Sequence, residues 1–135
     1  MGYESYNFEI QFSDVFDINK CTSAFLSMNY SSCKSQTLEK FLKGGFIEVL
    51  LNYSNISIRT AKANDTGVIA EIFKDTNTLK DIFQFDLFDL QLKKIVSPSC
   101  TDEVILNFIR LREEFQAHYP NVKYPIRCDD VFSNV

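Results

Sequence analysis

Residues 46–63 read FIEVLLNYSNISIRTAKA, and this stretch predicts that the fold contains an antiparallel sheet. Apolar residues alternate with others along its first half and again after Ser54–Asn55, as they do in strands with a buried face. Ser54–Asn55 itself suits a tight turn, because Asn tolerates a positive φ. We therefore predict a β-hairpin in which Arg59 on the second strand pairs with Glu48 on the first.

The regions on either side of the hairpin carry further patterns. Residues 6–13 place an apolar side chain at every second position, which predicts a strand. Four other segments repeat apolar residues every three or four positions, as amphipathic helices do. These helices are expected at 18–29, 36–43, 67–74 and 100–119, after the capping residues Asp17, Ser35, Asn64–Thr66 and Ser99. Gly44–Gly45 should end the second helix, and the polar run 75–78 should end the third.

Residues 82–92, IFQFDLFDLQL, fit two different structures. As a helix, the stretch would be apolar on nearly every side and would leave at least one of its two aspartates buried. As a strand with one β-bulge at Leu87–Phe88, its Phe and Leu residues face one way while Asp86 and Asp89 face the other. A buried carboxylate without a partner is costly, so we expect the bulged strand and keep the helix as the alternative.

Together these segments predict a single α+β domain that covers residues 1–135. We expect an antiparallel or mixed sheet of about four strands packed with about four helices. Residues 121–135 are expected to form an extended C-terminal tail. The 135 residues are 45% hydrophobic and include thirteen Phe, which is enough apolar material for a substantial core.

The charge of the chain is concentrated at one end. There are 18 acidic and 14 basic side chains, and residues 1–19 contain four acidic residues and no Lys or Arg. This segment therefore accounts for the whole net charge of −4. Because a nucleic-acid-binding protein needs a net basic face, we expect no direct contact with nucleic acid. A basic protein partner would suit this charge better.

The sequence contains no apolar run as long as a membrane span, and MGYESYNFEIQF lacks the basic and apolar regions of an export signal. We therefore expect a cytoplasmic protein that makes no membrane contact. In a reducing compartment, cysteines are expected as buried, reduced thiols rather than disulfides. The chain has four of them: Cys21, Cys33, Cys100 and Cys128.

The sequence offers little chemistry for catalysis. His118 is the single histidine, and its position at the end of the last predicted helix favours a structural role. With one histidine and no C-x-x-C spacing we predict no metal site, and the sequence has no glycine-rich phosphate-binding loop. We therefore expect no catalytic residue and no cofactor. An enzyme that uses one of the cysteines as a nucleophile stays as an alternative.

In these features the chain resembles the immunity proteins of bacterial polymorphic toxin systems, including those of contact-dependent growth inhibition. The resemblance lies in the small size, the acidic character, the strand FEIQF and the hairpin IEVLLNYSNISIRT. It implies a cytoplasmic antitoxin that binds one cognate toxin domain, for example a nuclease with a basic cleft, and neutralises it by occluding its active site.

The residues expected to bind the partner are acidic or aromatic side chains on the predicted surface: Asp86, Asp89, Tyr124, Asp129 and Asp130. The first two would form an acidic outer row on strand 82–92, and the other three lie in the predicted tail. We expect a monomer or a weak homodimer. The alternative function is a non-catalytic adaptor or structural module that self-associates through an edge of the hairpin or of strand 82–92.

Overall fold

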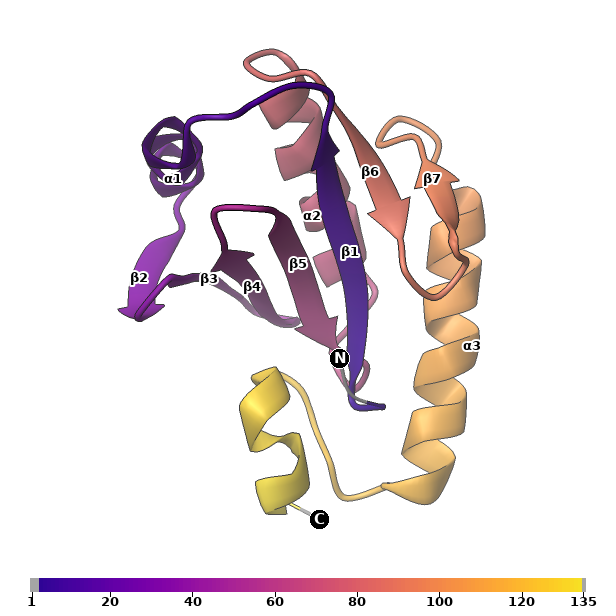
Figure 1. Cartoon of the computed structure of the whole chain (residues 1–135). Coiled ribbons are helices and arrows are strands. Elements are labelled where there is room, and N and C mark those ends of the chain that lie inside the picture. The colour runs from indigo at the N-terminus through magenta and orange to yellow at the C-terminus, as the bar shows by residue number, and fades with distance from the viewer. Residues whose placement is uncertain (1–2, 135) are drawn as a thin grey trace.

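The computed structural model describes residues 3–134, which form one α+β domain built on a single antiparallel sheet (Figure 1). Within these residues the sheet has seven strands, in the order β2-β3-β4-β5-β1-β6-β7. The strands are β1 (Ser5–Phe12), β2 (Ser31–Lys34), β3 (Thr37–Leu42), β4 (Gly45–Leu51), β5 (Ile56–Ala61), β6 (Phe85–Asp89) and β7 (Lys94–Val96). The helices are α1 (Ile18–Ser27), α2 (Gly67–Lys80), α3 (Asp102–His118) and the 3-10 helix η1 (Cys128–Asn134).

Strand β1 lies in the interior of the sheet although it comes first in the chain. It pairs with β5 on one side and with β6 on the other, so that Phe8 lies opposite both Ile58 and Asp89. β1 therefore joins two units that are far apart in sequence, the β2–β5 meander and the β6–β7 hairpin.

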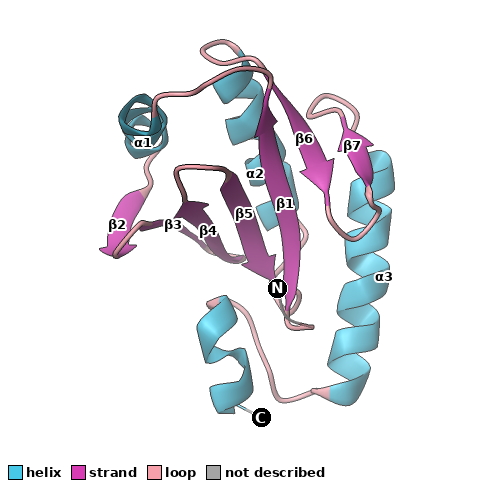
Figure 2. Ribbon diagram, viewed as in Figure 1, coloured by secondary structure: helices cyan, strands magenta, loops and turns pink. Residues whose placement is uncertain are grey.

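The α-helices supply the main core, on one face of the sheet. Figure 2 shows α2 behind the strands, and all three α-helices contribute buried side chains to one hydrophobic cluster. Phe8 of β1 packs edge-on against Phe73 of α2, with the ring centroids 5.6 Å apart. Tyr6 meets Phe108 of α3 at the same distance.

Several sequence predictions are confirmed. The strand at 6–13 is β1, the hairpin is β4–β5, and the helices at 18–29 and 100–119 are α1 and α3. Asp17 caps α1, because its side chain accepts hydrogen bonds from the first backbone amides of that helix. Arg59 forms the predicted ion pair with Glu48, with an N–O distance of 3.2 Å. The hairpin turn is longer than predicted, since it spans residues 52–55.

The strand interpretation of residues 82–92 is confirmed only in part. β6 covers Phe85–Asp89 without a bulge, and the chain then turns at residues 90–93 into β7. The shift in the apolar pattern comes from this turn. As a result, Phe88 faces away from the core together with Asp86, and Asp89 faces into the core with Leu87.

The prediction that Asp89 faces outward is therefore wrong. Its side chain is fully buried, at 0% exposure. Its Oδ2 accepts a 2.5 Å hydrogen bond from the Tyr6 hydroxyl, and Oδ1 accepts bonds of 2.8–2.9 Å from Gln91 and from the backbone amide of Leu92. The cost assigned to a buried carboxylate applies when donors are absent. Here the donors are present, and Asp89 also holds the β6–β7 turn in place.

The helix predicted at 36–43 is wrong, because this segment forms β3 in the sheet. Lys40 occupies a core-facing position, where an apolar residue would have made the alternation visible. Its ammonium group contacts Glu71 at 2.6 Å and Asp75 at 2.9 Å, both on α2. Gly44 consequently lies in the β3–β4 turn and Gly45 begins β4, so neither glycine ends a helix.

The break predicted at residues 75–78 is also absent, since α2 continues through them to Lys80. These polar side chains find partners inside the helical structure. Asp75 accepts hydrogen bonds from Lys40 and from the Tyr30 hydroxyl, and Thr76 donates to the carbonyl of Ile72. Burial raises the pKa of Asp75, and these hydrogen bonds act against that shift.

The predicted extended tail differs from the structure. After α3 the chain runs past the lower end of the sheet and ends in η1, near β5 (Figure 1). Its buried side chains form a second hydrophobic cluster with Ala61 and Phe115. Asn64 fixes the segment, because its amide bonds both the N–H and the carbonyl of Ile126 at 2.9 Å. The Glu48 carboxylate accepts a hydrogen bond from the amide of Cys128.

The α+β class is thus confirmed, while the expected number of strands, about four, is wrong because β2, β3 and β7 were not predicted as strands. Of the helices formed by residues 3–134, none combines the length and apolar character needed to cross a bilayer.

Replacing Tyr6 by Phe tests the role of the buried carboxylate. The variant keeps the ring and removes the hydroxyl that bonds Asp89, which leaves a buried oxygen short of a donor. We expect the free energy of unfolding, measured by urea denaturation, to fall by about 1–3 kcal/mol. Tyr3→Phe is the matched control, since Tyr3 is partly exposed. Equal stabilities of the two variants would contradict this account of Asp89.

Replacing Asn64 by Ala tests what holds the C-terminal segment. The change removes both hydrogen bonds to Ile126 and should cost about 1–3 kcal/mol of stability. We also expect the substitution to speed hydrogen exchange at the amides of Ile126 and Cys128, while exchange at the amides of β1 should change less. Asn121→Ala, at an exposed position of the same segment, should change neither quantity. Unchanged exchange in Asn64→Ala would show that other contacts fix the segment.

Candidate partner-binding surface

The two acidic residues predicted in the tail make ion pairs within the chain. Asp129 contacts Lys34 at 2.6 Å and Arg59 at 3.3 Å. The hydrogen bond from Lys34 holds the pKa of Asp129 below its usual range, with the Arg59 charge adding to the effect. Asp130 lies 4.0 Å from the guanidinium of Arg127. The negative charge of this region is therefore balanced by neighbouring cations.

The other predicted residues are separated from these two and from one another. Tyr124 is 46% exposed, and its ring lies 5.7 Å from the guanidinium of Arg112 on α3. Asp89 is buried in the core and cannot contact a partner. Asp86 is exposed on the face of the sheet that is opposite the helical core. The structure thus brings Asp129 and Asp130 together in η1 and leaves Asp86 in a different environment.

Asp86 belongs to a surface that we call the exposed sheet face. It lies on the side of the sheet away from α2, and in Figure 2 no helix of the described chain crosses in front of the upper parts of β1, β5 and β6. The strand register aligns one outward-facing residue from each of five neighbouring strands into a row across this face. Gln11 and Asp86, which are paired with each other, lie beside the row. The row is Leu50, Ser57, Glu9, Phe88 and Ile95.

The composition of this face is mixed. Leu50 is partly exposed at one end of the row, while Phe88 is partly exposed and Ile95 is 56% exposed at the other end. The polar residues Ser57 and Glu9 lie between them, and Asp86 lies beside the row. Neighbouring strands lie about 4.8 Å apart, which makes the five-strand row roughly 19 Å long. Apolar residues with charged neighbours are the arrangement found at many protein–protein interfaces.

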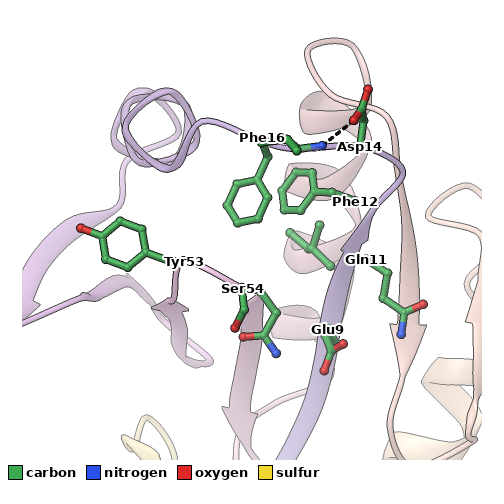
Figure 3. A pocket seen from close by; sticks show the side chains of 10 residues that line it. Glu9, Gln11, Phe12, Asp14, Phe16, Tyr53 and Ser54 are labelled. Carbon is green, nitrogen blue, oxygen red and sulfur yellow. Dashed lines mark hydrogen bonds between the residues drawn. The ribbon is translucent and has the colours of Figure 1, made fainter.

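A surface pocket adjoins the exposed sheet face at the end of β1, and we call it the β1 pocket. It has a volume of about 460 Å³ and lies between the segment after β1 and the β4–β5 turn (Figure 3). In Figure 3 the rings of Phe12 and Phe16 lie at its upper part, Tyr53 borders it on one side with its ring directed outward, and Glu9 and Ser54 lie at its lower end. The remaining lining residues are Ile10, Gln11, Asp14, Val15 and Asn55.

The carboxylates on this side of the molecule differ from those of η1 in their ion pairing. Among the described lining residues of the β1 pocket there are two carboxylates, Glu9 and Asp14, and no Lys or Arg. Within residues 3–134, neither of these nor Asp86 forms an ion pair, in contrast to Asp129. The exposed sheet face and the β1 pocket together therefore form an acidic surface with exposed apolar and aromatic side chains.

The cysteines differ in exposure, and three of them have a raised pKa. All four cysteines are free thiols; Cys21 and Cys128 are buried as predicted, whereas Cys33 and Cys100 are exposed. Burial raises the pKa of Cys21 to about 11 and raises the pKa of Cys33 and Cys128 as well. His118 contacts the carbonyl of Glu114 in its own helix. In the described part of the chain, no three or more His, Cys, Asp or Glu side chains gather in a way that could hold a metal ion.

Sequence reasoning missed Glu9, Asp14 and Tyr53 as site residues. The available signal was the charge of residues 1–19, which contain Glu9 and Asp14 and no basic residue. Tyr53 gave a second signal, since an aromatic residue beside a hairpin turn is frequently exposed, and it is 79% exposed here. What the sequence could not show is that β1 and the β4–β5 turn lie next to each other.

Comparisons with protein-family models, with curated proteins and with solved structures found no match to this chain. The surface is therefore interpreted from its own geometry and charge.

Proposed function

We propose that this chain is a non-catalytic binding protein that neutralises a cognate protein toxin by occluding a basic cleft on it. The observation that carries the proposal is the group of three carboxylates Glu9, Asp14 and Asp86, none of which is paired with a cation of the described chain. A basic partner would supply cations to pair with them. The proposal makes the chain an inhibitor whose binding face mimics an anionic substrate.

Electrostatics supports this proposal in two ways. Unpaired carboxylates on one surface attract a basic partner over distances of about one Debye length, roughly 8 Å at physiological salt. Close charge pairs at an inhibitor interface also have coupling energies of about 1.5–7 kcal/mol. Asp129 is not expected to attract a basic partner or to pair with it, because its carboxylate already forms ion pairs with Lys34 and Arg59.

The apolar side chains on the same surface support a protein partner rather than a small cation. Tyr53 is 79% exposed and Val15 is 96% exposed at the rim of the β1 pocket. Phe88 and Ile95 extend the apolar area across the sheet. Exposed aromatic residues of this kind are common binding hot spots in protein interfaces.

The alternative of a self-associating adaptor has less support. Neither the hairpin nor β6 forms an edge of the sheet, because both are paired on both sides. The edge strands of the described sheet are β2 and β7, and each is short and contains Lys. β2 is also irregular at Cys33. Short, charged and irregular edges are the devices by which proteins avoid strand-to-strand association.

Charge reversal on the exposed acids tests the proposed function. We expect Asp14→Lys combined with Asp86→Lys to weaken binding at least about tenfold, because each change turns an attraction into a repulsion. The measurement is a calorimetric titration with the purified domain encoded directly upstream of this chain, supported by an assay of that domain's toxic activity. The association rate of the unmodified chain should also fall as salt is raised.

The matched control is Glu113→Lys combined with Glu114→Lys, which changes the net charge equally on the exposed side of α3. It should leave the affinity nearly unchanged. Equal losses in the two variants would mean that only net charge matters, and no binding by the unmodified chain would contradict the toxin-neutralising role. A salt-insensitive dimer in sedimentation experiments would favour the adaptor instead.

A further inference from the structure

The β1 pocket is large enough to receive part of a partner molecule. Its volume of about 460 Å³ lies within the range of known ligand sites, roughly 300–1,000 Å³. It opens between the segment that follows β1 and the turn at 52–55, so a side chain can enter from solvent (Figure 3). The identity of the occupant follows from the groups that line the walls.

The charge of the walls selects a cation. The Glu9 carboxylate lies at the lower end of the pocket and the Asp14 carboxylate at its upper rim (Figure 3). The Glu9 side chain has no ion pair within the described chain, and a phosphate or carboxylate ligand would meet these two charges without any basic residue of the wall to offset them. The side-chain oxygens of Ser54 and Asn55 add further hydrogen-bond acceptors.

The aromatic rings that line the β1 pocket bear on which kind of cation it suits best. Phe12 and Phe16 stack with their centroids 4.0 Å apart and their planes 16° apart, and Tyr53 borders the pocket on another side (Figure 3). A planar guanidinium group stacks on aromatic faces and binds a carboxylate through two parallel hydrogen bonds. A lysine ammonium lacks the plane and is more strongly hydrated. Val15, at the rim, can cover the aliphatic part of an arginine side chain.

We propose that the β1 pocket binds the side chain of one arginine of the basic partner, with Glu9 accepting hydrogen bonds from the guanidinium group and Phe16 and Tyr53 contacting the side chain above it. This inference rests on the proposed function, since it names the group by which the partner engages the acidic surface. The arginine side chain fills the pocket while the rest of the partner covers the exposed sheet face.

The test uses N-acetyl-arginine methylamide as a probe, titrated into the full chain while backbone amide NMR shifts are followed. We expect saturable shifts at residues 9–17 and 52–55. The matched lysine probe should bind about two- to fivefold more weakly, because its ammonium keeps the charge but lacks the planar shape and the second parallel hydrogen bond of a guanidinium group. Shifts spread evenly over all acidic regions, or equal affinities for the two probes, would overturn the proposal.

Two variants localise the site. Glu9→Gln and Tyr53→Ala should each weaken binding of the arginine probe about two- to fivefold or more. Glu113→Gln and Tyr124→Ala are the matched controls, because these residues lie outside the pocket, and they should bind the probe like the unmodified chain. Unchanged binding in Glu9→Gln and Tyr53→Ala would overturn the assignment of these residues.

The outcomes separate this inference from the proposed function. If the probe does not bind the pocket while reversal of Asp14 and Asp86 still weakens partner binding, the arginine assignment fails and the proposed function stands. If the probe binds in the pocket but charge reversal leaves the partner's affinity unchanged, the pocket assignment stands and the proposed function fails.

Discussion

The pairing of β1 with both β5 and β6 is the constraint on which the rest of the structure depends. Without it, the β2–β5 meander and the β6–β7 hairpin would be separate units, and a two-stranded hairpin alone is marginally stable at best. The Tyr6–Asp89 hydrogen bond reinforces this pairing, because it connects β1 to the end of β6 inside the core. The first strand in the chain thus completes the sheet that all later elements pack against.

The same constraint creates the acidic surface. Because β1 has neighbours on both sides, its outward residues become part of a continuous face that reaches from β4 to β7. Because the chain leaves β1 beside the β4–β5 turn, Phe16 and Tyr53 come to border one pocket. The C-terminal segment covers another part of this side through Glu48 and Asn64, and its own acids are paired there. The two parts of the face therefore differ in net charge.

The sequence predicted the structure best in segments where the buried side chains are the apolar ones. The hairpin with its Glu48–Arg59 pair, and α1 with its Asp17 cap, could be predicted because their patterns are regular and local. The errors arose where polar residues are buried. Lys40, Asp75 and Asp89 interrupt the apolar patterns of β3, α2 and β6, and each is buried because a partner distant in sequence satisfies it. Such pairings depend on the tertiary structure, so no local pattern reports them.

Pairing in the folded chain also explains the outcome for the predicted site residues. Asp129 and Asp130 look like free acids in the sequence, yet Lys34 pairs with Asp129 from 95 positions away and Arg127 pairs with Asp130 from three positions away. Of the five predicted residues, Asp86 is the one acid that is both exposed and without an ion pair in the described chain. The sequence shows that residues 1–19 are acidic, but it does not show that Glu9 and Asp14 lie near Tyr53 in the folded chain.

The central claim is that a basic partner covers the exposed sheet face and the β1 pocket, and the most direct test is a hydrogen-exchange comparison of the free chain and the complex. We predict that binding slows exchange in residues 9–17, 50–57 and 86–88, while α3 and residues 121–134 stay unchanged. Protection confined to α3 or to residues 121–134, with these three segments unaffected, would contradict the account.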